Sequence, residues 1–220
     1  MTEGTGADGA RGIRRQFEVP QGPFGRLVGW LLARFNARLN AEAVRRLTPG
    51  PSGRVLEIGF GPGVALHLLS ESISAGLVAG IDPSVEMHRQ AARRNRGALA
   101  SGRLVLQQGT AAALPWPEES FDAVLSLNNI LLWRPMGQSL REVHRVLRPG
   151  GVFLAGLHEW AAREQATPAG GSVPEVLASL AEALRTAGFD RIQPEVVRVT
   201  IGRALLISSR KARPGPTERD

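Results

Sequence analysis

The residues best suited to chemistry lie between Val55 and Gly63, where the chain reads Val-Leu-Glu-Ile-Gly-Phe-Gly-Pro-Gly. A short apolar run of strand type ends in three glycines at alternate positions, Gly59, Gly61 and Gly63, and a helix-like segment follows. Glycine is needed where a backbone turns sharply, or where a ligand comes closer than a Cβ atom would allow. The segment therefore predicts a strand, a tight turn and a helix start, with a ligand lying against the glycines.

The spacing of the glycines bears on which ligand this is. The dinucleotide fingerprint G-x-G-x-x-G would need a glycine where the chain has Val64. The phosphate-loop pattern G-x-x-x-x-G-K-[S/T] is also absent from the loop. The loop reads G-x-G-x-G with Glu57 two positions before it, and this disfavours a pyrophosphate.

A second candidate, Asp82, closes the next strand-like run, 23 residues beyond Gly59. This is near the spacing at which an acidic residue accepts hydrogen bonds from a ribose diol. The alternative is a helix N-cap, because Pro83 and Ser84 follow and proline suits a first helical turn. We favour the ribose interpretation and keep the cap as its alternative.

Two further segments follow these features in order. Residues 114–122 read L-P-W-P-E-E-S-F-D, and residues 139–151 form an amphipathic helix pattern that ends in Pro-Gly-Gly. With the glycine loop and Glu57, they make the chain resemble the class I S-adenosylmethionine-dependent methyltransferases of the small-molecule type, over roughly residues 50 to 210. The resemblance implies an enzyme that uses S-adenosyl-L-methionine, and the absence of cysteine and of an apolar N-terminal segment predicts a cytoplasmic location.

The elements that must position these residues are predicted as an α/β fold. The resemblance implies a Rossmann-like, doubly wound, mostly parallel seven-stranded sheet with an antiparallel C-terminal strand. Strand-like runs lie at 55–58, 77–81, 104–108, 123–127, 152–157, 195–201 and 204–209, and helices at 64–73, 139–148 and 174–187. We expect an irregular excursion over 158–174 and a structural role for Asp122.

The resemblance also implies a set of cofactor contacts. Met87 would face the adenine, and Thr110 stands where relatives usually carry an acidic acceptor for the adenine amino group. Either Thr110 supplies a weaker oxygen or the backbone alone reads the adenine. The expected cofactor-binding residues are Glu57, Gly59, Phe60, Gly61, Gly63, Asp82, Pro83, Met87, Thr110, Ala111 and Asn128.

Asn128, Asn129 and Trp133 follow the fourth strand-like run, at the sheet edge where ligands bind in open α/β sheets. Their amides could bind the cofactor or polarise the substrate, with Asn129 as a catalytic candidate and Trp133 stacked on the substrate. Equally, the two asparagines could only cap the following turn. The sequence leaves both interpretations open.

A sulfonium is already a strong alkylating centre, so the enzyme mainly has to place a nucleophile in line with the methyl group. If a general base is used, His158 or Glu159 at the end of the fifth run is the best-placed candidate, although an isolated histidine is more often structural. No spacing of His, Asp and Glu residues indicates a metal site.

Apolar residues recur at helical spacing from Phe24 to Leu47. This segment either packs one face on the domain or covers the active site, in which case Phe24, Trp30 and Phe35 would touch the substrate. The predicted organisation is a flexible N-terminus with a helical lid segment over residues 1–50, a methyltransferase domain over 51–211, and a mobile tail over 212–220.

Composition narrows the function further. The chain has no cysteine, which excludes disulfides and thiolate chemistry, and no apolar run long enough to span a bilayer. The net charge of +7 rests almost entirely on arginines, with its excess at the N-terminus, and we do not read it as a nucleic-acid signal. We predict methylation of a small organic molecule; RNA or protein methylation and a non-catalytic binding module are the alternatives, and a homodimer stays open.

Overall fold

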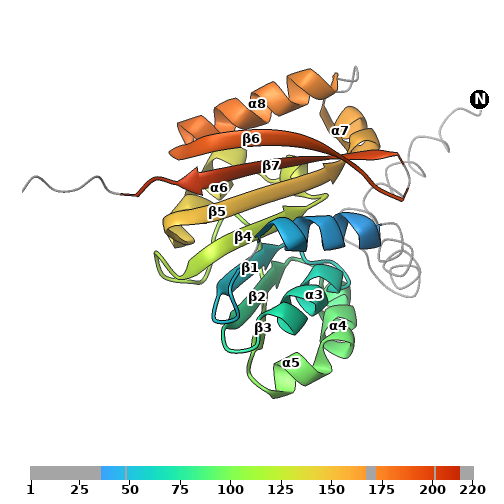
Figure 1. Cartoon of the computed structure of the whole chain (residues 1–220), viewed down its shortest axis with the longest axis vertical. Coiled ribbons are helices and arrows are strands. Elements are labelled where there is room, and N and C mark those ends of the chain that lie inside the picture. Colours follow the sequence, from blue (N-terminus) through green and yellow to red (C-terminus); the bar gives the residue numbers. More distant parts are fainter. Residues whose placement is uncertain (1–35, 48, 167–171, 201, 214–220) are drawn as a thin grey trace, which may run out of the picture.

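The computed structural model describes residues 36–47, 49–166, 172–200 and 202–213, which form a three-layer α/β fold (Figure 1). The central layer is a seven-stranded sheet. Its strands are β1 (Arg54–Ile58), β2 (Leu77–Asp82), β3 (Leu104–Gln108), β4 (Phe121–Leu127), β5 (Leu147–His158), β6 (Phe189–Arg198) and β7 (Arg203–Lys211).

The strand order is β3-β2-β1-β4-β5-β7-β6. β1 pairs in parallel with β2 and β4, and β7 runs antiparallel to both of its neighbours. The order reverses beside β1, so the crevice for a ligand lies beyond the carboxyl ends of β1 and β4. The predicted fold class, including the antiparallel C-terminal strand, is confirmed.

Helices cover both faces of the sheet, and each face has its own apolar core (Figure 1). On one face lie α3 (Val64–Ser72), α4 (Val85–Arg94), α5 (Arg96–Ala100) and the helix over residues 36–47. On the other lie α6 (Met136–Val146), α7 (Glu159–Ala166) and α8 (Val173–Thr186), next to a short 3-10 helix η1 (Ile130–Leu132). None of the helices in the described ranges combines the length and apolarity that crossing a membrane requires.

Two boundaries predicted from the sequence are wrong. The expected irregular excursion begins with helix α7, whose first residues are good helix formers and carry an i,i+4 ion pair between Glu159 and Arg163. Strand β6 begins at Phe189, six residues before the predicted start at Glu195. An irregular register between Asp190 and Gln193 interrupts the alternation there and hides the start of the strand.

The helix over residues 36–47 crosses the sheet near the carboxyl ends of its strands. Leu39 and Ala43 are fully buried in one core, and Leu39 packs close to Gly156 of β5. Arg46 forms ion pairs with Glu42 on the same helix and with Glu195 on β6. The described part of the predicted N-terminal helix therefore packs on the domain, and its first turn reaches the strand ends.

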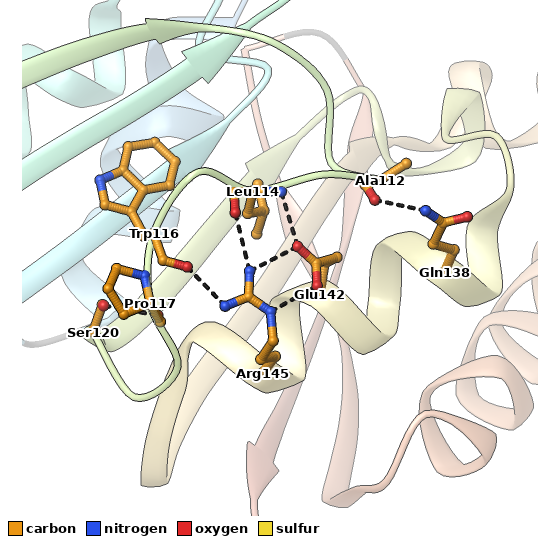
Figure 2. Close-up of polar contacts among 8 residues, drawn as sticks. All are labelled: Ala112, Leu114, Trp116, Pro117, Ser120, Gln138, Glu142 and Arg145. Carbon is orange, nitrogen blue, oxygen red and sulfur yellow. Dashed lines mark hydrogen bonds and ion pairs between the residues drawn. The ribbon is translucent and has the colours of Figure 1, made fainter.

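Helix α6 holds the loop that leads into β4 (Figure 2). The Arg145 guanidinium donates to the carbonyl oxygens of Leu114 (3.0 Å) and Trp116 (2.7 Å), while the Glu142 carboxylate accepts from the backbone N–H of Leu114 (2.9 Å). Gln138 donates to the carbonyl oxygen of Ala112. Side chains of the helix thus satisfy backbone groups of the loop.

Replacing Arg145 with methionine should test this arrangement. The variant keeps most of the side-chain volume but leaves two carbonyl groups without their donor and Glu142 without its ion-pair partner, so we expect the free energy of unfolding to fall by about 1–3 kcal/mol. Chemical denaturation measures the change. Arg141→Met, an exposed position on the same helix, is the control and should stay within about 0.5 kcal/mol of the wild type. Equal losses in both variants would contradict the account.

Candidate functional site

A cavity of ≈ 580 Å³ opens at the carboxyl ends of the parallel strands. Most of the residues expected to bind a cofactor line it, although they come from four different parts of the chain. These are Glu57, Gly59, Phe60, Gly61, Asp82, Pro83, Met87, Thr110, Ala111 and Asn128, and the cavity is also lined by Asn129 and Trp133. Gly63 and His158 are not among the described lining residues. Phe24, Trp30 and Phe35 lie outside the described residues.

The three glycines of the loop have different reasons to be glycine, although all have positive φ angles. A Cβ atom on Gly59 would lie 2.4 Å from the side chain of Asn129, and one on Gly63 would lie 2.7 Å from that of Asn95. A Cβ atom on Gly61 would meet no protein atom within 4 Å. Packing therefore explains Gly59 and Gly63, while at Gly61 open space next to the cavity is left for a ligand.

The Asp82 carboxylate joins the glycine loop to the start of α4. One oxygen accepts from the backbone N–H of Gly61 (2.9 Å) and the other from that of Ser84 (2.8 Å). The N-cap of α4 is Ser84, whose hydroxyl accepts from the N–H of Met87, so the cap interpretation of Asp82 is wrong. Burial raises the pKa of Asp82, while the N–H groups of Ser84 and Gly61 oppose that rise. Each oxygen keeps lone pairs that a ligand hydroxyl could use.

Glu57 is 2% exposed, and its Oε2 atom has no hydrogen-bond partner. Burial raises the pKa of Glu57 well above its usual range, the negative charge of Asp82 raises it further, and the backbone N–H of Leu66 works in the opposite direction. A buried carboxylate that faces a cavity without a cation is costly unless something else supplies the partner. The site therefore fits a ligand that brings a positive charge or an N–H group.

The Asn129 amide is fully used by protein atoms. Its nitrogen donates to the carbonyl oxygens of Ile58 (3.0 Å) and Leu127 (2.9 Å), and its oxygen accepts from the Ser126 hydroxyl (3.0 Å) and the Trp133 indole N–H (2.8 Å). Its side chain makes no capping bond to η1. Asn129 thus ties the end of β4 to the start of the glycine loop, and it has no hydrogen-bonding capacity left for a substrate.

The neighbouring positions are also held firmly. Asn128 adopts φ 60°, and its side-chain oxygen accepts from the backbone N–H of His158 (3.0 Å), which joins the ends of β4 and β5. Trp133 is 7% exposed, and its ring stacks on Phe153 with 6.1 Å between ring centroids. Trp133 therefore lines the cavity as a largely buried ring that is held by Phe153.

Neither His158 nor Glu159, the two candidates for a general base, is among the described residues that line the cavity. Glu159 pairs with Arg203 and Arg163, whose hydrogen bonds lower the pKa of Glu159 to about 2. His158 is 2% exposed, and its Nε2 atom lies 2.9 Å from the side-chain oxygen of Asn36. Burial lowers the pKa of His158, which favours the neutral ring. Asn36, not His158, reaches the cavity.

Sequence reasoning missed Asn36 and Asn40, which line the cavity from the helix over residues 36–47. Asn40 is 7% exposed, and its side-chain nitrogen donates to the carbonyl oxygen of Asn36. The signal was present: both asparagines lie on the side of the helix that buries Leu39 and Ala43, where an apolar stripe would be expected. Arg134 and Ser139 also line the cavity and were not predicted.

Comparisons with known proteins agree with this geometry. Residues 55–151 match the Methyltransferase domain family. The chain is 31% identical over 125 residues to the uncharacterized methyltransferase YdaC of Bacillus subtilis, covering 57% of this chain and 67% of that protein. It is 38% identical over 101 residues to the fatty-acid O-methyltransferase of Mycolicibacterium smegmatis, covering 46% of this chain but only 35% of that protein.

Among solved structures, a SAM-dependent methyltransferase from Aquifex aeolicus superposes with a TM-score of 0.65 at 19% identity, covering 82% of this chain and 93% of that one. At this identity the likeness concerns the fold alone.

Gly61 and Gly102 offer a matched pair for testing the open space at the loop. Both have positive φ angles, and at neither would a Cβ atom meet protein atoms within 4 Å. Alanine at either position should therefore lower the free energy of unfolding similarly, by about 1–2 kcal/mol. Only Gly61→Ala should weaken the binding of S-adenosylhomocysteine in calorimetry, by about tenfold or more. Unchanged binding in Gly61→Ala would remove the loop from the binding site.

Glu57→Gln should stabilise the ligand-free protein at neutral pH. A carboxyl group whose pKa is raised in the folded state stabilises fully below its unfolded pKa of about 4.3, and this contribution is lost as the pH rises through the folded value. We therefore expect the variant to gain about 1–3 kcal/mol over the wild type at pH 8, with the difference vanishing near pH 4. Denaturation at both pH values measures it; Glu182→Gln, at an exposed position, should show no such pH dependence.

Proposed function

The chain belongs to the class I S-adenosylmethionine-dependent methyltransferases, and we propose that it transfers a methyl group from S-adenosyl-L-methionine to a small organic molecule with an apolar body. One observation carries the proposal: a single cavity joins two buried carboxylates at one end to apolar side chains at the other. The carboxylates suit a positively charged cofactor. The apolar side chains suit an organic acceptor.

Residues at the ends of neighbouring strands would hold successive parts of the cofactor. Asp82, at the end of β2, presents lone pairs to the ribose hydroxyls, and Gly61 allows the close approach of the backbone. Met87 and Ala111 provide a buried apolar surface for the adenine, with Thr110 at the rim. Glu57 supplies an acceptor for the ammonium group of the methionyl end. When bound, the cofactor supplies an electrophilic methyl group on a sulfonium.

The protein contributes binding, orientation and exclusion of water. Asn129 fixes the glycine loop against the end of β4, so we infer that it is a positioning residue and not a catalytic one. Trp133 contributes a rigid wall, because its indole is held by Asn129 and packed on Phe153. Proximity in a dry cavity then lowers the barrier to transfer without acid–base help from these residues.

The size and polarity of the acceptor follow from the other end of the cavity. Leu131, Leu132 and Trp133 line it from the segment after β4, and no described residue there forms a charged cage for a polyanion. The fatty-acid O-methyltransferase of Mycolicibacterium smegmatis, with which this chain shares sequence, is named for an acceptor with a long apolar body. Both points support a small, largely apolar acceptor.

Asp82→Ala should weaken S-adenosylhomocysteine binding by about tenfold or more, because it removes a charged acceptor and frees the Gly61 N–H. Asp190→Ala removes a carboxylate from exposed β6 and serves as the control for net charge. Since burial raises the pKa of Asp82, wild-type affinity should fall as the pH drops through that raised pKa, and the variant should lose this part of the pH dependence. Calorimetry across this pH range measures both effects; equal affinity in the two variants would contradict the ribose role.

The function itself is tested by incubating the protein with a bacterial metabolite extract and isotopically labelled S-adenosyl-L-methionine. Mass spectrometry should find a small molecule that gains one labelled methyl group, and the Gly61→Ala variant should produce less of it. Labelled RNA or labelled protein with no labelled small molecule would overturn the proposal.

A further inference from the structure

The contact between His158 and Asn36 joins residues 122 positions apart in the chain, at the edge of the cavity. The His158 ring lies between Asn36 on one side and the indole of Trp160, which stacks on it with 6.0 Å between centroids. Its backbone N–H is fixed by Asn128. Three contacts, all with other residues of the protein, therefore hold the histidine in place.

The hydrogen-bonding pattern fixes which way the Asn36 amide points. The Nδ1 atom of His158 is buried and has no partner, whereas Nε2 faces the Asn36 oxygen at 2.9 Å. In a neutral ring one nitrogen carries the proton, and a buried N–H without an acceptor costs more than a bare lone pair. The proton therefore sits on Nε2 and is donated to Asn36. The Asn36 NH₂ group is left as a donor for the cavity.

Strand order places this donor at the acceptor end. Apart from Asn128 after β4, the cofactor candidates lie in or after β1, β2 and β3, which occupy one side of the sheet, and β4 and β5 come next. Neighbouring strands lie about 4.8 Å apart, so the end of β5 is about 10 Å beyond the glycine loop that follows β1. His158 is the last residue of β5, and the Asn36 side chain contacts the His158 ring. The Asn36 donor therefore faces the space beside the cofactor, not the cofactor's nucleoside end.

The described part of the cavity also lacks a base at that end. Its titratable lining residues in the described ranges are Glu57, Asp82 and Arg134. The two acids belong to the cofactor end, and Arg134, which donates to the carbonyl oxygens of Leu131 and Trp133, cannot accept a proton. None of the described lining residues at this end could take a proton from an acceptor during transfer.

We propose, on the basis of the function proposed above, that the methyl acceptor is a carboxylate, and that Asn36, oriented by His158, is the residue that selects it. The Asn36 NH₂ group donates to one carboxylate oxygen, and the Arg134 side chain adds a positive potential to the same cavity. His158 is a positioning residue that acts through Asn36.

A carboxylate satisfies the chemistry without a base. One of its oxygens forms a bond to the methyl carbon, while the sulfur keeps the electron pair of the broken sulfur–carbon bond. The products are a methyl ester and S-adenosylhomocysteine, and no proton moves. Because a positive and a negative charge are both neutralised, a dry cavity favours the step.

Decanoate and decylamine, which share an apolar body and differ in the charge of the head group, are suitable probes. Titrated into protein saturated with S-adenosylhomocysteine, decanoate should bind and decylamine should not. Asn36→Leu should weaken decanoate binding by about tenfold or more, while affinity for S-adenosylhomocysteine stays within about twofold. Arg38→Leu, on the exposed side of the same helix, is the control and should bind decanoate as the wild type does.

Two further readouts separate positioning from packing. His158→Leu should reproduce the loss of decanoate binding, and His158→Gln, which keeps an N–H donor, should restore most of it. With labelled S-adenosyl-L-methionine kept at a saturating concentration at each pH, the rate of methyl decanoate formation should be flat between about pH 6 and 9, where the acceptor carboxylate is already ionised.

The inference is overturned if decylamine binds as well as decanoate, or if Asn36→Leu leaves decanoate binding unchanged. Failure of the wild type to bind S-adenosylhomocysteine would instead overturn the proposed function. Binding of S-adenosylhomocysteine without any binding of decanoate would overturn the carboxylate assignment alone.

Discussion

The side chain of Asn129 is the interaction on which the site depends. At the carboxyl edge of a parallel sheet the backbone ladder ends, and buried carbonyl groups need other partners. Asn129 supplies them for Ile58 and Leu127 and is itself locked by Ser126 and Trp133. The same side chain occupies the space that a Cβ atom on residue 59 would need. One amide thus fixes both the path of the glycine loop and the wall opposite it.

A second constraint is the unequal distribution of charge along the cavity. Glu57 and Asp82 are both buried, and the charge of Asp82 adds to the rise in the pKa of Glu57, whereas the described residues at the other end include the donors Asn36 and Arg134. Ionisation of Glu57 is unfavourable in the free protein, because its Oε2 atom has no hydrogen-bond partner and Asp82 carries a charge of the same sign. It becomes favourable when a cation occupies the acidic end. Binding of a sulfonium cofactor would remove this unfavourable interaction, and its removal would contribute to the free energy of binding.

Much of the fold and of the candidate site could be predicted from the sequence, because the sequence signals for these parts are local. The glycine loop, the position of Asp82 and the Pro-Gly-Gly stop each depend on neighbouring residues, and each predicted strand holding them is present. Contacts between residues that are far apart in the chain could not be predicted from the sequence. Nothing near His158 indicates that Asn36 lies 2.9 Å away, since the contact depends on how a helix crosses the sheet. The packing reason for Gly63 could not be predicted either, because its neighbour Asn95 comes from the end of α4.

The central claim is that this sheet edge holds an adenosyl cofactor between the carboxylates and the glycine loop. A crystal structure of the protein soaked with S-adenosylhomocysteine tests it most directly. The account predicts ribose hydroxyls within hydrogen-bonding distance of Asp82, the ammonium group next to Glu57, and the sulfur facing the space bordered by Asn36. A ligand bound elsewhere on the protein, or a ribose that avoids Asp82, would contradict it.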